Sequence, residues 1–138
     1  MLNWKTKDAE KINQLANNGL MKALNIKVTE ISDECLKGEM TVTSLHHQQY
    51  GVLHGGASCV FAETLGSIAS NITLENGKKA VGTQIMMNHL RPFKQGVLAG
   101  LARPIHVGKS RQIWEIEIFN QENKLISQGQ LTTQIIDF

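Results

Sequence analysis

The sequence of 138 residues contains little of what marks several common classes of protein. Aromatic residues make up only 5% of it and prolines number two, so it indicates neither a base-stacking platform nor a proline-rich linker. The net charge is +2 and no basic block stands out, which argues against a nucleic acid partner. No apolar run reaches the roughly 18 residues of a membrane span, and the first residues do not resemble a signal peptide.

Cysteines are scarce as well. Cys35 and Cys59 are the only two, and their spacing fits neither a metal site nor a disulfide framework. We therefore expect a reducing, cytoplasmic setting and no metal centre. The content of 41% hydrophobic and 19% charged residues is ordinary for a globular protein, and the length predicts one domain over residues 1–138.

Hydrophobic periodicity predicts a short helix, two strands, one long helix and four further strands, in that order. The short helix is expected over residues 8–18, where Asn18-Gly19 ends it, and the long helix from Gly55-Gly56 to about Glu75. The expected strands cover residues 25–31, 35–43, 80–90, 96–106, 111–120 and 125–136, with a loop over 44–53. This order indicates an α+β fold in which an antiparallel sheet packs against one apolar helix.

The start of the long helix, His54-Gly55-Gly56, is the first candidate for chemistry. Two consecutive glycines expose backbone N–H groups where the first turn of a helix has donors without intrahelical acceptors. Such a place can polarise a carbonyl or hold an oxyanion, although the glycines can also serve only a tight turn and close packing. Gln48 and His54 flank it from the loop: Gln48 can orient a water or the substrate, and His54 can bind a carbonyl or fix the turn.

Glu63 is the second candidate, because it is the only charged residue between Ala57 and Leu74. It lies well away from the apolar centre of the long helix, on a flank of small residues that comprises Cys59, Gly66, Ser67 and Ser70. A carboxylate in such surroundings indicates a pocket or an interface, and the alternative is a surface glutamate with incidental neighbours.

The spacing of the two candidates predicts an oligomer. Glu63 follows Gly55 by eight residues, which is roughly 12 Å along a helix. One bound carbonyl cannot touch both groups of the same helix. If both act on one substrate, Glu63 must come from a second copy, and two antiparallel helices about a two-fold axis would form two equivalent sites.

Cations gather at two further places. Arg91 and Lys94 lie at the expected end of one strand, and Lys109, Ser110 and Arg111 form a turn between two others. Together they offer charges, a hydroxyl and backbone amides to a phosphate-bearing ligand. A scattered, solvated surface is the alternative for each of them.

Five stretches resemble the hotdog-fold thioesterases, in particular the bacterial acyl-CoA thioesterases of the phenylacetate-pathway and 1,4-dihydroxy-2-naphthoyl-CoA branch. The stretches are QQYGVLHGG at 48–56, AETLGS at 62–67, VG at 81–82, NHLRP at 88–92 and QIWEIEI at 112–118. They span essentially the whole chain, and one departure is Gln49, where relatives often carry proline. The resemblance implies a sheet wrapped around one long central helix, with a short N-terminal helix.

The resemblance also implies roles. Glu63 would be the general base or nucleophile, and the Gly55 N–H would polarise the thioester carbonyl with support from His54. Gln48 and Ser67 would position the water or the acyl group. The nucleotide and phosphates of coenzyme A, which is part of the substrate and not a cofactor, would meet His89, Arg91 and the turn Lys109-Ser110-Arg111. Such enzymes are usually homotetramers built as a dimer of dimers.

The acyl group remains open at this point. Hydroxynaphthoyl, hydroxybenzoyl, phenylacetyl and medium-chain acyl groups all fit the pattern, with an aryl-CoA favoured. Two other functions are compatible with the same fold. One is an enoyl or hydroxyacyl thioester hydratase-dehydratase, and the other is a non-catalytic module that binds acyl-CoA.

Overall fold

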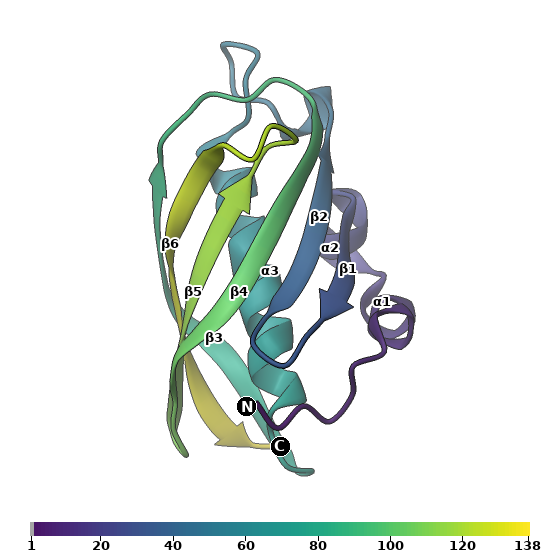
Figure 1. The fold of residues 1–138 in the computed structure, drawn as a ribbon, viewed down its shortest axis with the longest axis vertical. Coiled ribbons are helices and arrows are strands. Elements are labelled where there is room, and N and C mark those ends of the chain that lie inside the picture. Colours follow the sequence, from purple (N-terminus) through teal and green to yellow (C-terminus); the bar gives the residue numbers. More distant parts are fainter. Residues whose placement is uncertain (1) are drawn as a thin grey trace.

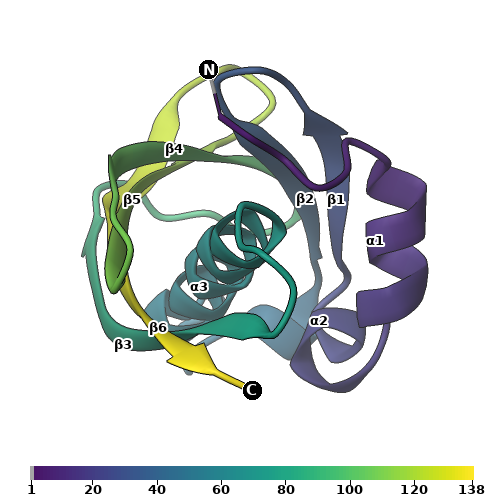
Figure 2. The same cartoon turned by 90° about the horizontal axis from the view of Figure 1, so that it is seen from below.

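In the computed structural model, which describes residues 2–138, a six-stranded antiparallel sheet curves around one long helix (Figure 1). The helices are α1 (Ala9–Ala16), α2 (Gly19–Ala23) and α3 (Gly55–Ile72), with a short 3-10 turn η1 (Ser44–His46). The strands are β1 (Ile26–Ile31), β2 (Leu36–Val42), β3 (Lys78–His89), β4 (Gly96–Val107), β5 (Arg111–Phe119) and β6 (Leu125–Asp137). Their order across the sheet is β1-β2-β4-β5-β6-β3, and the end-on view shows them passing around α3 (Figure 2). The wrapped sheet and central helix are those that the resemblance implies.

The elements predicted from periodicity are present, with ends shifted by a few residues. Asp8 caps α1, because its carboxylate accepts a hydrogen bond of 3.0 Å from the Lys11 N–H. Two details of the prediction are wrong. The first helix ends near the predicted stop, since α1 ends at Ala16 and Asn18 is extended, but the chain then forms the unpredicted short helix α2. The predicted loop before α3 contains η1, which Thr43 caps.

The face that α3 buries is rotated from the predicted one. Its buried residues are Ala57, Ser58, Phe61, Ala62, Leu65, Gly66, Ala69 and Ser70. Gly66 and Ser70 were expected on the Glu63 flank, yet both face the sheet, and a Cβ on Gly66 would lie 2.6 Å from Leu131 Cδ2. The small residues therefore allow α3 to approach its own sheet closely, while Val60, Glu63 and Ser67 remain only half-buried.

A buried polar network fixes the far end of α3 on the sheet. Gln112 of β5 is almost fully buried, and its Oε1 accepts hydrogen bonds from the Ser70 hydroxyl at 2.7 Å and the Trp114 indole at 3.0 Å. Its amide nitrogen donates to Thr73 Oγ1 at 3.0 Å. Leaving any one of these buried groups unpaired would cost free energy of folding. The network therefore fixes the rotation of α3 about its axis, and with it the side of α3 that turns away from the sheet.

The two outer edges of the sheet differ. The β1 edge lies under α1 (Figure 2), where the Asn13 amide donates to the Val28 carbonyl and accepts from the Val28 N–H, both at 2.8 Å. At the opposite edge, β3 pairs only with β6, and within residues 2–138 no strand covers its other side. This twelve-residue edge strand carries exposed Val81 and Met86. An open edge of this length and apolarity is suited to pairing with another strand.

Candidate active site

The start of α3 leaves one backbone donor free. His54 is the N-cap, and its Nδ1 accepts a hydrogen bond of 2.7 Å from the Gly56 N–H. The His54 carbonyl accepts from Ala57 at 2.9 Å and from Ser58 at 3.4 Å. Of the donors in the first turn, only the Gly55 N–H has no acceptor among residues 2–138. A free N–H at a helix start can polarise a carbonyl oxygen.

The same cap fixes the hydrogen position on His54. Because Nδ1 of the neutral ring accepts the Gly56 N–H, the ring hydrogen is carried by Nε2. The His54 side chain is exposed, so Nε2–H remains able to donate to an oxygen bound beside Gly55. Gly55 and His54 therefore offer a backbone donor and a side-chain donor from adjacent residues.

Two imidazole rings pack against the two glycines. A Cβ on Gly55 would lie 2.7 Å from His89 Nε2, and a Cβ on Gly56 would lie 2.8 Å from His54 Nδ1. Nδ1 of His89 is 3.1 Å from the hydroxyl of Ser127, a buried residue of β6. His89, which the resemblance assigns to coenzyme A, thus lies beside the Gly55 donor in the same chain. The sequence allowed two functions for Gly55-Gly56, close packing or the exposure of a free N–H donor. In the structure both are found.

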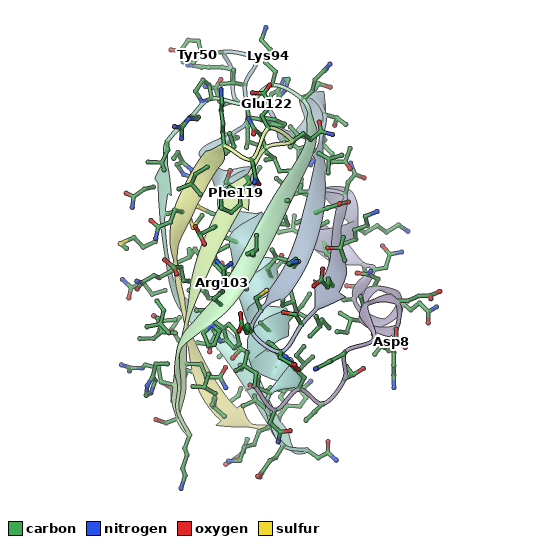
Figure 3. All side chains as sticks on the ribbon, viewed as in Figure 1. Asp8, Tyr50, Lys94, Arg103, Phe119 and Glu122 are labelled. Atoms are coloured by element: carbon green, nitrogen blue, oxygen red, sulfur yellow. The ribbon has the colours of Figure 1, made fainter. Side chains whose placement is uncertain are left out.

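Gln48 belongs to the loop that ends at His54. The two arms of this loop pair at His47 and Leu53, and the Gln48 side-chain oxygen accepts a hydrogen bond from the Tyr50 N–H. The side-chain NH₂ group of Gln48 is the part left to donate to a substrate or water. Tyr50 and Lys94 extend from neighbouring loops at this end of the molecule (Figure 3), where the His47 ring is 2.6 Å from the Lys94 carbonyl.

Glu63 lies on the half-buried side of α3 that faces the edge strand β3. Its carboxylate sits over Gly82 of β3, where a Cβ would collide with Glu63 Oε1. Glu63 takes part in none of the ion pairs found within residues 2–138. Burial raises the pKa of the neighbouring Cys59 thiol, and the Glu63 carboxylate raises it further. Glu63 is therefore a half-buried carboxylate with no cation beside it.

Gly82 and Ser127 are the two site residues that sequence reasoning missed. Gly82 was noted only as part of a matching stretch, and Ser127 was not singled out. A glycine inside a strand is a signal of close approach by another group, so Gly82 could have been found on that ground. No comparable signal marks Ser127, since its partner His89 lies 38 positions away and is reached only through the pairing of β3 with β6.

Apart from the turn Lys109-Ser110-Arg111, the predicted site residues fall into two groups within one chain. Gln48, His54, Gly55, His89 and Arg91 belong to the end where α3 begins. Glu63 and Ser67 lie farther along the same unbroken helix, with Glu63 roughly 12 Å from Gly55 along its axis. The single chain therefore does not bring Gly55 and Glu63 together.

The predicted cation sites lie at opposite ends of the molecule. Arg91 donates a hydrogen bond of 2.6 Å to the Leu125 carbonyl, at the end that holds the start of α3. The turn Lys109-Ser110-Arg111 joins β4 to β5 at the other end, near both chain termini (Figure 1). There Lys109 lines a hollow of about 440 Å³ together with Thr73, which caps the C-terminus of α3. One chain alone does not bring these cations together.

No group of three or more His, Cys, Asp or Glu side chains is placed to hold a metal ion within residues 2–138. Of the helices described there, none has the length and apolarity needed to cross a membrane.

Comparison with known proteins identifies the family of the chain. Residues 50–127 match the family described as the thioesterase superfamily. The 1,4-dihydroxy-2-naphthoyl-CoA hydrolase of Escherichia coli (strain K12) is 38% identical over 134 residues, which are 96% of this chain and 98% of that protein. A crystal structure of a thioesterase from Haemophilus influenzae is similar with a TM-score of 0.94 and 40% identity, covering 99% of this chain and 96% of that one.

A second solved structure represents the other branch that the sequence resembles. It is the Escherichia coli PaaI protein from the phenylacetic acid degradation operon, with a TM-score of 0.81 and 28% identity, covering 91% of this chain and 90% of that one. The family match and the relatives cover most of the sequence, and the matched region includes Gly55 and Glu63. The chain therefore belongs to the thioesterase superfamily and is a thioester hydrolase with the hotdog fold.

Proposed function

We propose that this protein hydrolyses acyl-CoA thioesters to the free acid and coenzyme A, at a site that two protomers share. The observation that supports the proposal most strongly is the free Gly55 N–H at the start of α3, next in sequence to the exposed His54, whose Nε2–H is a second donor. These two donors can receive the charge that develops on a thioester oxygen. The half-buried carboxylate of Glu63, which forms no ion pair within residues 2–138, supplies the base or nucleophile.

The proposed reaction begins when the thioester oxygen binds to the Gly55 N–H and to His54. Glu63 then either takes a proton from a water that attacks the carbonyl carbon or attacks that carbon itself to give a mixed anhydride. In both routes the carbon–sulfur bond breaks and coenzyme A leaves as a thiolate, which then takes up a proton. In the second route a water molecule then hydrolyses the mixed anhydride, which releases the free acid and restores the Glu63 carboxylate. The Gln48 amide and the Ser67 hydroxyl position the water or the acyl group.

The open edge of β3 supports the required dimer. Two copies that pair along β3 in antiparallel fashion would form one continuous sheet about a two-fold axis. The half-buried side of α3, with Glu63 and Ser67, would then approach the start of the partner's α3. Each of the two sites would combine Glu63 from one copy with Gly55 and His54 from the other. Two such dimers would form the expected homotetramer.

The same antiparallel arrangement supports the proposed coenzyme A site. It would bring the turn Lys109-Ser110-Arg111 of one copy toward the end of the other copy that carries His89 and Arg91. Guanidinium and ammonium groups in this arrangement would suit the phosphates of the nucleotide. His89, which lies against Gly55, would then contact the part of coenzyme A nearest the thioester.

An aryl-CoA is the favoured substrate class. The name of the Escherichia coli relative, 1,4-dihydroxy-2-naphthoyl-CoA hydrolase, supports an aromatic acyl group such as hydroxynaphthoyl or hydroxybenzoyl. The thioesterase names of the relatives also favour hydrolysis over enoyl hydration and over binding alone. A panel of aryl- and alkyl-CoA substrates, followed by release of free thiol, distinguishes these possibilities.

The first prediction tests the role of Glu63. We expect Glu63→Gln to lower kcat by orders of magnitude, because the amide can neither accept a proton nor attack the carbonyl. Binding of a non-hydrolysable acyl-CoA analogue should change little. The control is Glu34→Gln, an exposed carboxylate in the β1–β2 turn, which should keep normal turnover. Near-normal thiol release by Glu63→Gln would remove Glu63 from this role.

A further inference from the structure

Gly82 of β3 lies directly under the carboxylate of Glu63. A Cβ on Gly82 would collide with Glu63 Oε1 and would lie 3.4 Å from Glu63 Cδ. The next neighbour of that Cβ, Leu131 Cδ1 of β6, would be 3.5 Å away, which is an ordinary contact distance. The carboxylate therefore occupies the space that a side chain at position 82 would fill, and only glycine allows this approach.

The strand around Gly82 is held in place on both sides. Two residues earlier, the Asn71 amide of α3 donates to the Ala80 carbonyl at 3.0 Å and accepts from the Ala80 N–H at 2.9 Å. Directly after Gly82 the pairing with β6 shifts register, and the hydroxyl of the extra residue Thr83 donates to the Thr132 carbonyl at 3.2 Å. Such bulges are common next to active sites. A strand fixed in this way cannot move away from α3 to admit a side chain.

The Glu63 side chain is much freer to move than the strand. Glu63 is half-buried, and it forms no ion pair within residues 2–138 that would hold its carboxylate in one place. A methyl group at position 82 would therefore displace the carboxylate and leave the backbone of β3 where it is. A misplacement of about 1 Å at a reacting group can slow an enzyme about a hundredfold.

We propose that Gly82 is a positioning residue, whose missing side chain determines where the Glu63 carboxylate lies relative to the thioester carbonyl. The inference rests on the proposed function, in which Glu63 is the base or nucleophile. The alternative is a glycine needed only for the packing of β3 against α3. In that case a side chain at position 82 would weaken the fold and would not act on the reaction through Glu63.

The test compares Gly82→Ala with the unaltered protein in kcat and KM for hydroxybenzoyl-CoA and in urea denaturation. We expect kcat to fall about tenfold to a hundredfold, with KM and the urea midpoint nearly unchanged. The control is Gly100→Ala on β4, where the new Cβ would lie 2.6 Å from Leu65 Cδ1 and 2.8 Å from Phe61 Cζ, both buried in the core. This overpacking should lower the urea midpoint and leave kcat close to normal.

A second background shows whether Gly82 acts through Glu63. The carboxylate of Glu63→Asp is shorter by one methylene group, so it does not reach the space over residue 82. Glu63→Asp itself should be slow, but adding Gly82→Ala to it should lower kcat further by only about twofold or less. The same fold-loss from Gly82→Ala in both backgrounds would overturn the inference.

The remaining outcomes separate this inference from the proposed function. A normal kcat in Gly82→Ala, or a failure of that variant to fold, would assign Gly82 to packing alone, while thiol release by the unaltered protein would still support hydrolysis. If the unaltered protein releases no thiol, the proposed hydrolysis fails, and a crystal structure of Gly82→Ala then decides the inference. A Glu63 carboxylate displaced from its place over residue 82 would support it, and an undisplaced carboxylate would refute it.

Discussion

At the residue scale, the start of α3 depends on glycines that admit two imidazole rings. Gly55 has an additional role because its N–H is free, whereas the Gly56 N–H is bound by His54. A substitution at Gly55 can therefore act in two ways. It can remove the donor, or it can push the His89 ring away with a Cβ. Two variants separate these effects.

The second prediction compares Gly55→Pro with Gly55→Ala. Proline suits the first position of a helix; it removes the N–H and adds a Cβ as part of its ring, while alanine adds a Cβ and keeps the N–H. We expect Gly55→Pro to lose roughly 3 kcal/mol of transition-state stabilisation, beyond any loss in Gly55→Ala. Steady-state kcat/KM for an acyl-CoA measures both. Equal losses of kcat/KM in the two variants would mean that the packing of residue 55 against His89, and not the N–H donor, accounts for the loss.

The third prediction concerns the Cys59 thiol. Burial and the Glu63 carboxylate both raise its pKa, which lowers the fraction of reactive thiolate at a given pH. Glu63→Gln removes the second cause, so the pKa should fall and Cys59 should react faster with iodoacetamide at pH near 8. Peptide mass spectrometry follows Cys59 separately from the buried Cys35. An unchanged or slower rate relative to Glu34→Gln would show that the carboxylate is not beside the thiol.

Sequence reasoning could single out the candidate residues Glu63 and Gly55, but not the residues that contact them. Glu63 was identifiable because it is the only charge along most of α3, and Gly55 because glycines at a helix start expose donors. The contacts of Gly82 with Glu63 and of Ser127 with His89 depend on how strands pair and on where α3 crosses them. Such contacts arise from tertiary packing and have no local pattern in the sequence.

At the scale of single elements, α3 is the part whose placement matters most. Its boundaries follow from local signals, namely the His54 cap and the apolar period. Its buried face does not follow from local signals. Gly66 and Ser70 are not strongly hydrophobic, and yet they form the closest approach of α3 to the sheet. The short helix α2 was missed for a related reason, since five residues are too few to display a period.

The fourth prediction tests the network that fixes α3. We expect Gln112→Leu to lower the free energy of unfolding by about 1 to 3 kcal/mol, because the Ser70 hydroxyl and the Trp114 indole lose a buried acceptor. Urea denaturation followed by circular dichroism measures the change. Gln130→Leu, an exposed position on the neighbouring strand β6, is the control and should be close to neutral. Equal stability of the two variants would mean that the network does not hold the helix.

At the scale of the whole molecule, the two edges of the sheet suggest how the site is completed. The β1 edge is covered by α1, whose Asn13 binds the strand, while the β3 edge is open within residues 2–138 and lies next to Glu63 through Gly82. The need for a second copy followed from helix geometry alone, since the rise per residue separates Gly55 from Glu63. Which edge would receive that copy could not be read from the sequence, because strand order is set by long-range pairing.

The fifth prediction tests the shared site directly, by mixing two inactive variants. Glu63→Gln and Gly55→Pro, each expected to be nearly inactive alone, are denatured and refolded together so that the protomers exchange. If each site combines Glu63 of one copy with Gly55 of the other, a mixed dimer contains one intact site, and an equal mixture should regain about a quarter of normal activity. If both groups act within one protomer, the mixture should remain as inactive as its two components, and that result would contradict the account.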